Sequence, residues 1–434
     1  MYWYISFLRP PPVSITSQTK EVVITPQIAN DLRTELRYNP TTIHYTWQRL
    51  SPTLSPSTSP KELTIFIPPQ STYKPIAVPL PSNVQIGESW RLGLFSPPTE
   101  KGEGAGPSSS LLGLCEDEVD VIGVWSEGIN IVRSEVTSTA GVVKGVNGKS
   151  SRHKEKEKEN SRDGKNGKSK GKEKEKEKDD GPKQGRITRD FTLPRHQVLE
   201  SQQGTEQEML RIIEQTSFDL DKKIWDSGLA LSSWFWKYLP STSDLDGKSD
   251  ELVRKVFDLL RQEDDLDILE IGSGTGLVSI ALALAIQRYL PDSKRNIIAT
   301  DLDTAIPLMN ENLSFNSLLS SSSSNAQVNA KVLDWDQPLP SWVSSNPPEL
   351  IVAADVTYNT SAFPSLLRTL TSLLAPSPAK KPPILILAYK QRDPSERDLW
   401  TMLQEKGVSL RLVDKVVGVE RDQGETEIWI GRMI

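Results

Sequence analysis

Three glycines at alternate positions mark the first segment whose residue types could do chemistry. The run Asp267-Ile-Leu-Glu270-Ile-Gly272-Ser-Gly-Thr-Gly276 places an apolar strand directly before a glycine turn that opens a helix. Glycine permits positive φ angles and lets the backbone approach a ligand closely. A dinucleotide-binding loop would read G-x-G-x-x-G, but here the third glycine comes one residue early. The segment predicts a binding turn of another kind; a turn needed only for helix–strand packing is the alternative.

Acidic and aromatic residues follow the next two apolar strands. Asp301 ends the second strand, where an acid can accept hydrogen bonds from both hydroxyls of a ribose. Asp303 competes for that role, or caps the following helix. Trp335 follows the third strand, where its ring could stack on an adenine. A tryptophan buried as part of the core is the simpler interpretation of Trp335.

A fourth apolar strand ends in Ala353-Ala354-Asp355-Val-Thr-Tyr358. In open α/β sheets the ligands lie beyond the carboxyl ends of the strands. Asp355 and Tyr358 are therefore candidates for contact with a substrate. The competing role for Asp355 is to stabilise the turn after the strand, which aspartate often does.

The elements that must position these residues alternate between strands and helices. Expected strands are 267–271, 296–300, 328–333, 350–354, 384–389, 408–417 and 427–430, and expected helices are 277–290, 305–315, 363–374 and 395–406. The short turn between the last two strands allows only antiparallel pairing. The order predicts an α/β fold in which five parallel strands and a terminal antiparallel pair form one Rossmann-like seven-stranded sheet with helices on both faces.

These features resemble class I S-adenosylmethionine-dependent methyltransferases, in which an acid before the glycine turn suits the ammonium group of the cofactor. Over residues 190–434 the chain is similar to the seven-strand protein-lysine methyltransferases called methyltransferase family 16. The similarity is carried by four motifs: Trp225-Asp-Ser-Gly228, the glycine turn, Leu333-Asp-Trp335 and the D-x-x-Y motif Asp355–Tyr358. The segments 214–220 and 389–397 add to it and resemble fungal members that methylate translation elongation factor 2.

The resemblance implies S-adenosyl-L-methionine as cofactor and a protein lysine as methyl acceptor. Matched by position, the cofactor contacts it implies are Trp225, Glu270, Gly272, Ser273, Gly274, Asp301, Trp335 and Ala354. The resemblance also implies that Asp355 and Tyr358 contact the substrate or take part in catalysis. Asp355 would orient the amine or accept its proton, although a carboxylate is a poor base for an amine of pKa near 10. The implied partner is a protein, for which the fungal members suggest elongation factor 2, and a monomer is expected.

A charged tract divides the chain. Residues 144–186 hold 16 Lys or Arg and 9 Asp or Glu, a net charge of +7, so the rest of the chain carries −13 of the total of −6. A tract with so few apolar residues cannot offset the entropy of ordering. We expect a spacer rather than a nuclear-localisation or nucleic-acid patch, because the interleaved glutamates weaken its field. The predicted division is an irregular β-rich region over 1–136, this spacer over 137–188 and a methyltransferase domain over 189–434.

Composition excludes several classes of protein. Cys115 is the single cysteine, which rules out an internal disulfide and a thiolate metal cluster, and the three histidines lack ligand spacing. No apolar run approaches the roughly 20 residues of a membrane helix, and 1–12 do not resemble a secretory signal. The cytoplasm is therefore the expected location, with the nucleus as the alternative. A small-molecule N- or O-methyltransferase, or a cofactor-binding module with vestigial activity, are the competing functions.

Overall fold

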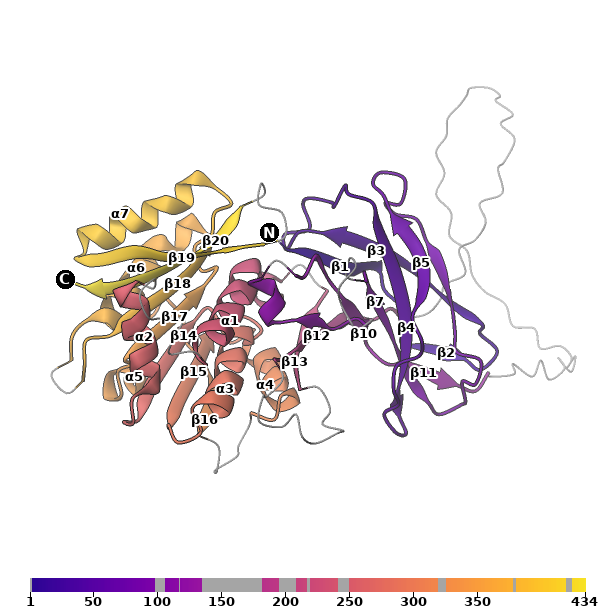
Figure 1. Ribbon diagram of the computed structural model, residues 1–434, viewed down its shortest axis with the longest axis horizontal. Coiled ribbons are helices and arrows are strands. Elements are labelled where there is room, and N and C mark those ends of the chain that lie inside the picture. Colours follow the sequence, from indigo (N-terminus) through magenta and orange to yellow (C-terminus); the bar gives the residue numbers. More distant parts are fainter. Residues whose placement is uncertain are drawn as a thin grey trace, which may run out of the picture.

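The computed structural model describes most of the 434-residue chain. The described residues are 2–97, 106–116, 118–134, 182–194, 208–216, 219–240, 250–318, 325–377, 380–418 and 424–434. Most of the predicted spacer, His196 and the serine run 320–324 lie outside them. Within the described part, the chain folds into a β region and an α/β region that lie against each other (Figure 1).

The α/β region is built on one sheet of seven strands in the order β16-β15-β14-β17-β18-β20-β19. Its strands are β14 (Leu266–Ile271), β15 (Arg295–Asp301), β16 (Ala326–Val332), β17 (Leu350–Ala354), β18 (Ile384–Lys390), β19 (Val408–Val417) and β20 (Glu425–Met433). The first five are parallel, and β20 is antiparallel to both β18 and β19. The last strand thus inserts between β18 and β19. The predicted fold class is confirmed.

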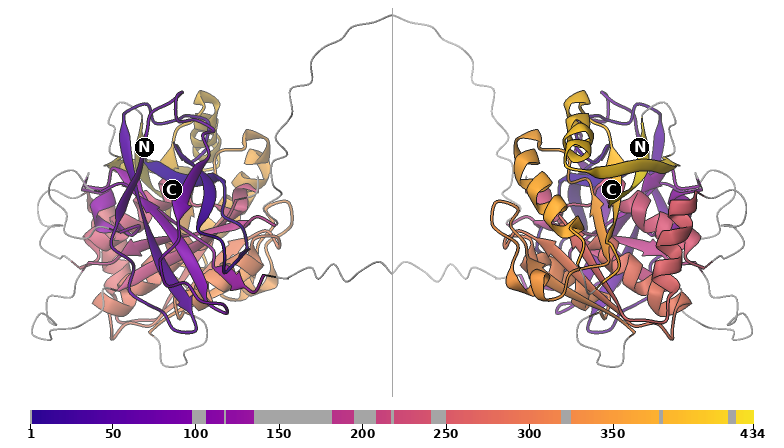
Figure 2. Two further views of the ribbon diagram at one scale, coloured as in Figure 1. Left: turned by 90° about the vertical axis from the view of Figure 1, so that its right-hand side faces the viewer. Right: turned by 90° about the vertical axis from the view of Figure 1, so that its left-hand side faces the viewer.

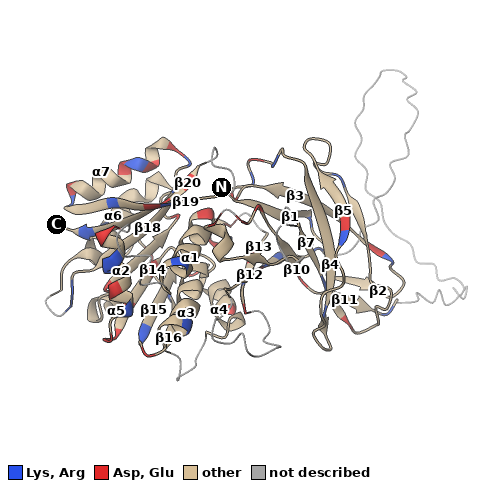
Figure 3. Cartoon of the chain, viewed as in Figure 1, with Lys and Arg blue, Asp and Glu red and all other residues tan. Residues whose placement is uncertain are grey.

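Helices cover both faces of this sheet, because successive residues of its strands point to opposite sides. Ile268 belongs to the core that the sheet shares with the first four helices, and Leu269 belongs to the core on the other face. The helices are α1 (Asp226–Tyr238), α2 (Glu251–Arg261), α3 (Leu277–Tyr289), α4 (Ile306–Phe315), α5 (Ser341–Ser345), α6 (Phe363–Leu374) and α7 (Asp398–Glu405). Short 3₁₀ turns are η1 (Leu112–Leu114), η3 (Leu220–Lys222), η4 (Thr360–Ala362) and η5 (Pro394–Arg397). Charged residues lie mainly on these helices and on loops, and few lie on the central strands (Figure 3).

The β region contains two sheets that share one apolar core. A four-stranded sheet has the order β6-β3-β1-β9, and a nine-stranded sheet contains the path β13-β12-β10-β7-β11-β2 together with β4, β5 and β8. The bounds are β1 (Trp3–Arg9), β2 (Ser14–Thr16), β3 (Glu21–Ala29), β4 (Thr41–Ser51), β5 (Lys61–Phe66), β6 (Ile76–Pro79), β7 (Ser89–Phe95), β8 (Ser109–Ser110), β9 (Val121–Ile122), β10 (Val124–Ser126), β11 (Ile129–Val132), β12 (Arg186–Thr192) and β13 (Met209–Gln215).

Three long strands of this region, β1, β3 and β4, were not predicted from the sequence. The residues of β1 and β3 are buried on both faces along much of their length, so the polar–apolar alternation that indicates a half-buried strand is weak there. In β4 the apolar residues Ile43, Tyr45 and Trp47 do alternate with polar residues, so this strand carried a local signal that was missed. The boundary predicted at residue 188 falls inside β12, which pairs with β10 and β13 in the nine-stranded sheet. Strands β12 and β13 are therefore paired with the β region.

Strand β1 joins the two regions, because its two faces pack in different directions. Trp3, Ile5 and Phe7 belong to the core of the β region. Tyr2 and Tyr4 belong to the core that includes α1 and α3. Figure 2, which looks at the molecule from its two ends, shows the two regions one behind the other. A continuous apolar core thus connects them.

Asn312 of α4 and Asn316, which directly follows that helix, supply hydrogen-bond partners to the outer edge of β13. The side-chain oxygen of Asn312 accepts from the Ile213 N–H at 2.8 Å, and its amide donates to the Ile213 carbonyl at 3.2 Å. Asn316 repeats the pattern at Arg211, with distances of 2.9 and 2.7 Å. An edge strand with unpaired backbone groups is costly to bury. Helix α4 therefore completes the hydrogen bonding of the β region.

We predict that Asn312→Ala lowers the free energy of unfolding by about 2–4 kcal/mol, because it leaves partly buried backbone groups of β13 and the buried Thr275 carbonyl without this partner. Urea unfolding of the full chain measures this change. Asn310→Ala, on the same helix, is the control and should change the free energy by about 0.5 kcal/mol or less. Equal losses in the two variants would contradict the bridging role of Asn312.

Candidate active site

A cavity of about 270 Å³ opens at the carboxyl ends of β14, β15 and β17. The register explains why these ends meet: Ile271 of β14 pairs with Thr300 of β15 and with Ala353 of β17. The residues that follow the ends of these three strands therefore lie at the same edge of the sheet. All ten residues predicted for the site line this cavity: Trp225, Glu270, Gly272, Ser273, Gly274, Asp301, Trp335, Ala354, Asp355 and Tyr358.

The glycine turn brings bare backbone to the cavity wall. Gly272 and Gly274 have φ angles of +63° and +53°, which L residues rarely adopt. A Cβ atom on Gly272 would lie 2.8 Å from a Val356 methyl group and 3.4 Å from the Trp335 ring. A Cβ on Gly274 would lie 3.3 Å from the Asp221 carbonyl oxygen. The positions therefore require glycine for conformation and for space.

Glu270 is buried beneath the turn. Its carboxylate accepts from the backbone N–H of Ser279 at 3.0 Å and from the Ser279 hydroxyl. Burial raises the pKa of Glu270 to about 7, although the bonds from Ser279 oppose the shift. The carboxylate thus ties β14 to the first turn of α3. Contact with a cofactor ammonium group stays a prediction.

Asp301 lies across the cavity from the loop that precedes α1. Its carboxylate accepts from the N–H of Gly274 at 2.8 Å and from the N–H of Leu302 at 2.7 Å. Burial is the main cause that raises the pKa of this carboxyl group. Asp303, the alternative from the sequence, is exposed and does not line the cavity. Between the two acids, the geometry favours Asp301 for a ligand in this cavity.

The two tryptophans line different parts of the wall. Trp335 is half-buried, and its ring lies beside Gly272. Trp225 precedes α1, and its indole nitrogen donates to the Leu220 carbonyl at 3.0 Å. The Arg392 guanidinium lies 5.5 Å from the centroid of the Trp225 ring. Each tryptophan therefore has a packing role and a cavity-facing surface.

Asp355 occupies a strained position at the end of β17. It is buried and has a φ of +56°, unusual for a residue with a side chain. Arg392 donates to both of its carboxylate oxygens, at 2.6 and 3.1 Å, and the Ser227 N–H donates to one of them at 3.1 Å. Tyr358 is 55% exposed at the cavity mouth, and desolvation followed by the charges of Asp301 and Asp221 raises its pKa.

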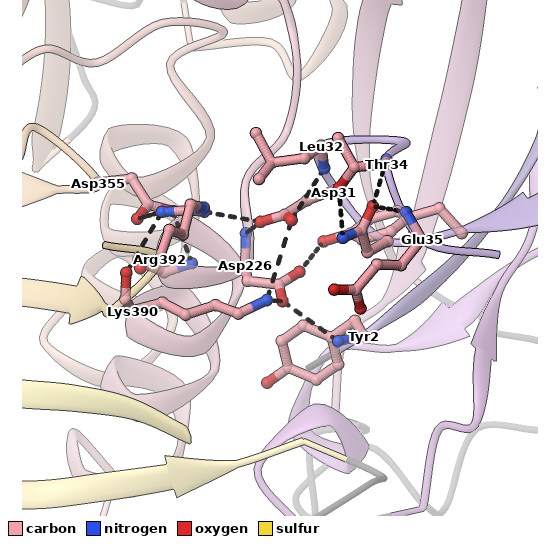
Figure 4. A network of polar contacts seen from close by, with 12 residues as sticks. Tyr2, Asp31, Leu32, Thr34, Glu35, Asp226, Asp355, Lys390 and Arg392 are labelled. Carbon is pink, nitrogen blue, oxygen red and sulfur yellow. Dashed lines mark hydrogen bonds and ion pairs between the residues drawn. The ribbon is translucent and has the colours of Figure 1, made fainter. Parts of the chain in front are cut away.

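Sequence reasoning missed the cations behind Asp355. Lys390 and Arg392 come at and just after the end of β18, beside β17. Arg392 donates to Asp31 of the β region, and Lys390 donates to Asp226 (Figure 4). The sequence did contain a sign of them: two cationic residues come at the end of an otherwise apolar strand. Buried charges need partners, so such residues indicate an ion pair. The partner Asp31 had no local sign in the sequence.

The cavity contains no cluster of metal-ligating side chains among the described residues. In the same described ranges, the longest apolar helices fall short of what a bilayer crossing requires. Polar groups, glycine backbone and the aromatic rings of Trp225, Trp335 and Tyr358 therefore define the chemistry of the cavity.

Comparison with known proteins identifies the domain around this cavity. Residues 204–406 match the family described as lysine methyltransferase. This stretch, just under half of the chain, is similar to the lysine methyltransferases. The predicted family and enzyme class are thereby confirmed, and the glycine turn, Asp301, Trp335 and Asp355 all lie in the matched range.

Individual relatives cover parts of the chain. Protein-lysine N-methyltransferase EFM6 of Saccharomyces cerevisiae is 28% identical over 44% of this chain and 72% of its own length. Protein-lysine N-methyltransferase rrg1 of Schizosaccharomyces pombe is 31% identical over 37% of this chain and 47% of its own. A solved methyltransferase structure from Pyrococcus furiosus matches 47% of this chain and 98% of that chain, with 16% identity and a TM-score of 0.28. The chain thus spans about half the length of the second relative.

We predict that Gly274→Ala weakens binding of S-adenosylmethionine to the methyltransferase domain by at least about tenfold, or 1.4 kcal/mol. The added methyl group strains the turn and presses on the Asp221 carbonyl, whose loop lines the cavity. Calorimetric titration measures the affinity. Gly407→Ala is the matched control, because Gly407 also has a positive φ, of +81°, but no atom lies within 4 Å of an added Cβ. The same loss of affinity in both variants would contradict the role of the turn.

The pKa of Glu270 predicts a pH dependence of stability. A carboxyl group whose pKa is about 7 when folded, against 4.5 ordinarily, binds its proton more tightly in the folded state. Its contribution to stability is therefore present at low pH and is lost as pH rises from about 4.5 through 7. Glu270→Gln should gain on the order of 2 kcal/mol relative to wild type between pH 5 and pH 8. Urea unfolding at both pH values measures this; a constant difference between the two proteins would contradict it.

Proposed function

We propose that this chain transfers a methyl group from S-adenosylmethionine to the side-chain amine of a lysine in a protein substrate. The observation that carries the proposal is that the glycine turn, Asp301 and Trp335 surround one cavity, with Asp355 at its far side. The matched lysine methyltransferase family supports the reaction type. The small-molecule and vestigial alternatives lack a comparable observation.

The residues of the cavity suit the proposed cofactor. The glycine turn brings backbone with positive φ angles to the cavity wall, where a ligand can approach the main chain closely. Asp301 keeps acceptor capacity beyond its two backbone bonds, because a carboxylate accepts about four hydrogen bonds, and so it can hold ribose hydroxyls. Trp335 offers a ring face to the adenine. When bound, the cofactor would supply an electrophilic methyl group on a positively charged sulfur.

The chain's own residues would align and desolvate the acceptor amine. A lysine ammonium must lose its proton before it can react, and transfer from water into a partly apolar cavity lowers its pKa. Most of the rate is expected from holding the amine in line with the methyl group. Tyr358, exposed at the mouth, is placed to contact the stem of the lysine side chain.

We assign Asp355 the role of orienting the amine through its fixed negative charge. Three N–H groups already donate to this carboxylate, two from Arg392 and one from Ser227. These bonds occupy three of the about four acceptor positions of a carboxylate. The amine proton would therefore leave to water at the cavity mouth.

The finer parts of the proposal come from the sequence. Similarity to fungal family members favours translation elongation factor 2 as the substrate. The net charge of −13 outside the charged tract favours a basic surface on the partner. A monomeric state and a cytoplasmic location stay predictions.

Mass spectrometry of cell lysate incubated with the full chain and isotope-labelled S-adenosylmethionine tests the function. We expect labelled methyl-lysine in a translation factor. Asp355→Asn should retain cofactor affinity and reduce turnover at least about tenfold, or 1.4 kcal/mol, because it keeps the shape and removes the charge. Asp303→Asn, an exposed carboxylate near the cavity, should behave as wild type. Methylarginine or a methylated metabolite as the sole product, or a preference for NAD over S-adenosylmethionine, would refute the proposal.

A further inference from the structure

Arg392 connects the cavity to the β region. Its guanidinium donates to both oxygens of Asp355 and, at 2.7 Å, to an oxygen of Asp31. The side chains of Asp355, Arg392 and Asp31 are 4%, 14% and 1% exposed. Figure 4 shows the guanidinium between the two carboxylates. A planar guanidinium with two carboxylate partners has little freedom to turn. The position of Arg392 therefore depends on both acids.

Asp31 is itself held rigidly by the loop after β3. The Asn30 side-chain oxygen accepts from the N–H groups of Thr34 and Glu35 at 2.9 and 3.3 Å. The Asn30 N–H donates to the Glu35 carbonyl at 3.0 Å, which closes the loop. One Asp31 oxygen accepts from the Leu32 N–H at 2.9 Å, and the other accepts from Arg392 and from the Asp226 N–H. The β region thus presents Asp31 as a fixed carboxylate.

A second cation, Lys390, also links the end of β18 to the β region. The Lys390 ammonium donates to Asp226 at 2.5 Å and lies 3.9 Å from Asp31. Asp226 also accepts from the Tyr4 hydroxyl at 2.7 Å and from the Tyr2 N–H at 3.3 Å. Both tyrosines belong to the β1 segment, so β1 and the loop after β3 hold the end of β18 together.

The described residues of the β region do not line the cavity. They can influence the reacting groups through Arg392, which bonds both to Asp31 and to Asp355. Asp355 needs such support, because a positive φ at a residue with a side chain persists only where its surroundings enforce it. Release of Arg392 from Asp31 would let the guanidinium turn and carry the Asp355 carboxylate with it.

We propose that Asp31 is a positioning residue of the active site, which acts through Arg392 to fix Asp355, so that the β region is a necessary part of the catalytic centre. This inference rests on the role proposed for Asp355. It assigns a function to the β region, which neither the family match nor the cavity explains. It also predicts that the methyltransferase domain alone lacks full activity.

Asp31→Asn tests the proposal, since it keeps the shape of the side chain. The buried cluster holds three carboxylates, Asp31, Asp226 and Asp355, and two cations, so the variant leaves two of each and should fold. We expect kcat on the protein substrate to fall at least about fivefold, with the affinity for S-adenosylmethionine changed less than about twofold. Glu88→Gln is the matched control: it weakens the 3.1 Å pair with Arg49 next to β4 and β7, an ion pair of the same region that involves neither Arg392 nor the loop that carries Asp31. The control should lower Tm without changing kcat.

A double-mutant cycle with Asp355→Asn separates positioning from general destabilisation. For turnover, Asp31→Asn should add less than about twofold to the loss in Asp355→Asn, because no carboxylate is left to position. For Tm, the double variant should lose more than the sum of the single losses, because Arg392 is then buried without a carboxylate. Wild-type kcat in Asp31→Asn, or independent multiplication of the two kinetic losses, would overturn the proposal.

The double-mutant cycle measured by Tm needs no substrate. It therefore distinguishes a failure of the proposed function from a failure of the proposed coupling between Asp31 and Asp355. If wild type methylates no protein lysine but the Tm losses are synergistic, the proposed function fails and the coupling of Asp31 to Asp355 through Arg392 stands. If the enzyme is active and the Tm losses simply add, the coupling fails and the proposed function stands.

Discussion

A buried cation that must find carboxylate partners is the constraint on which the arrangement of this molecule depends. Arg392 comes from the end of β18 in the α/β region, and it lies between an acid of its own region and one supplied by the loop after β3. Burying a guanidinium without such partners costs several kcal/mol. The same constraint applies to Lys390, which Asp226 and Asp31 surround. Satisfying both cations fixes how the two regions meet.

Apolar packing makes this contact part of a shared core. Strand β1 directs Trp3 and Ile5 into the β region and Tyr2 and Tyr4 toward α1. The side chains of Asn312 and Asn316, at the C-terminal end of α4, accept hydrogen bonds from backbone N–H groups along the edge of β13. Polar contacts of this kind select one relative placement, whereas apolar packing alone tolerates several. The methyltransferase domain and the β region are therefore coupled at a place directly behind the cavity.

Local patterns in the sequence predicted the α/β sheet and the cavity wall well, because the signals are short-range. Parallel strands covered on both faces give continuous apolar runs such as 350–354, and the glycine turn shows directly in its residue types. The β region was harder to predict, since β1 is buried on both faces along much of its length and does not alternate. The pairing of Asp31 with Arg392 joins residues 361 apart in the chain, and no pattern within either segment encodes it. Long-range charge pairing of this kind follows only from the folded topology.

The charge balance of the buried cluster bears on what the cavity can receive. Asp355 is the member of the cluster whose carboxylate reaches the cavity, whereas burial and the neighbouring charge of Asp31 raise the pKa of Asp226 behind it. Arg392 holds the Asp355 carboxylate in place and satisfies part of its hydrogen-bonding capacity. An ammonium group entering from the mouth would meet this carboxylate, and a partly desolvated site strengthens that attraction. An anionic acceptor would be repelled, so the position of Asp355 favours an amine substrate.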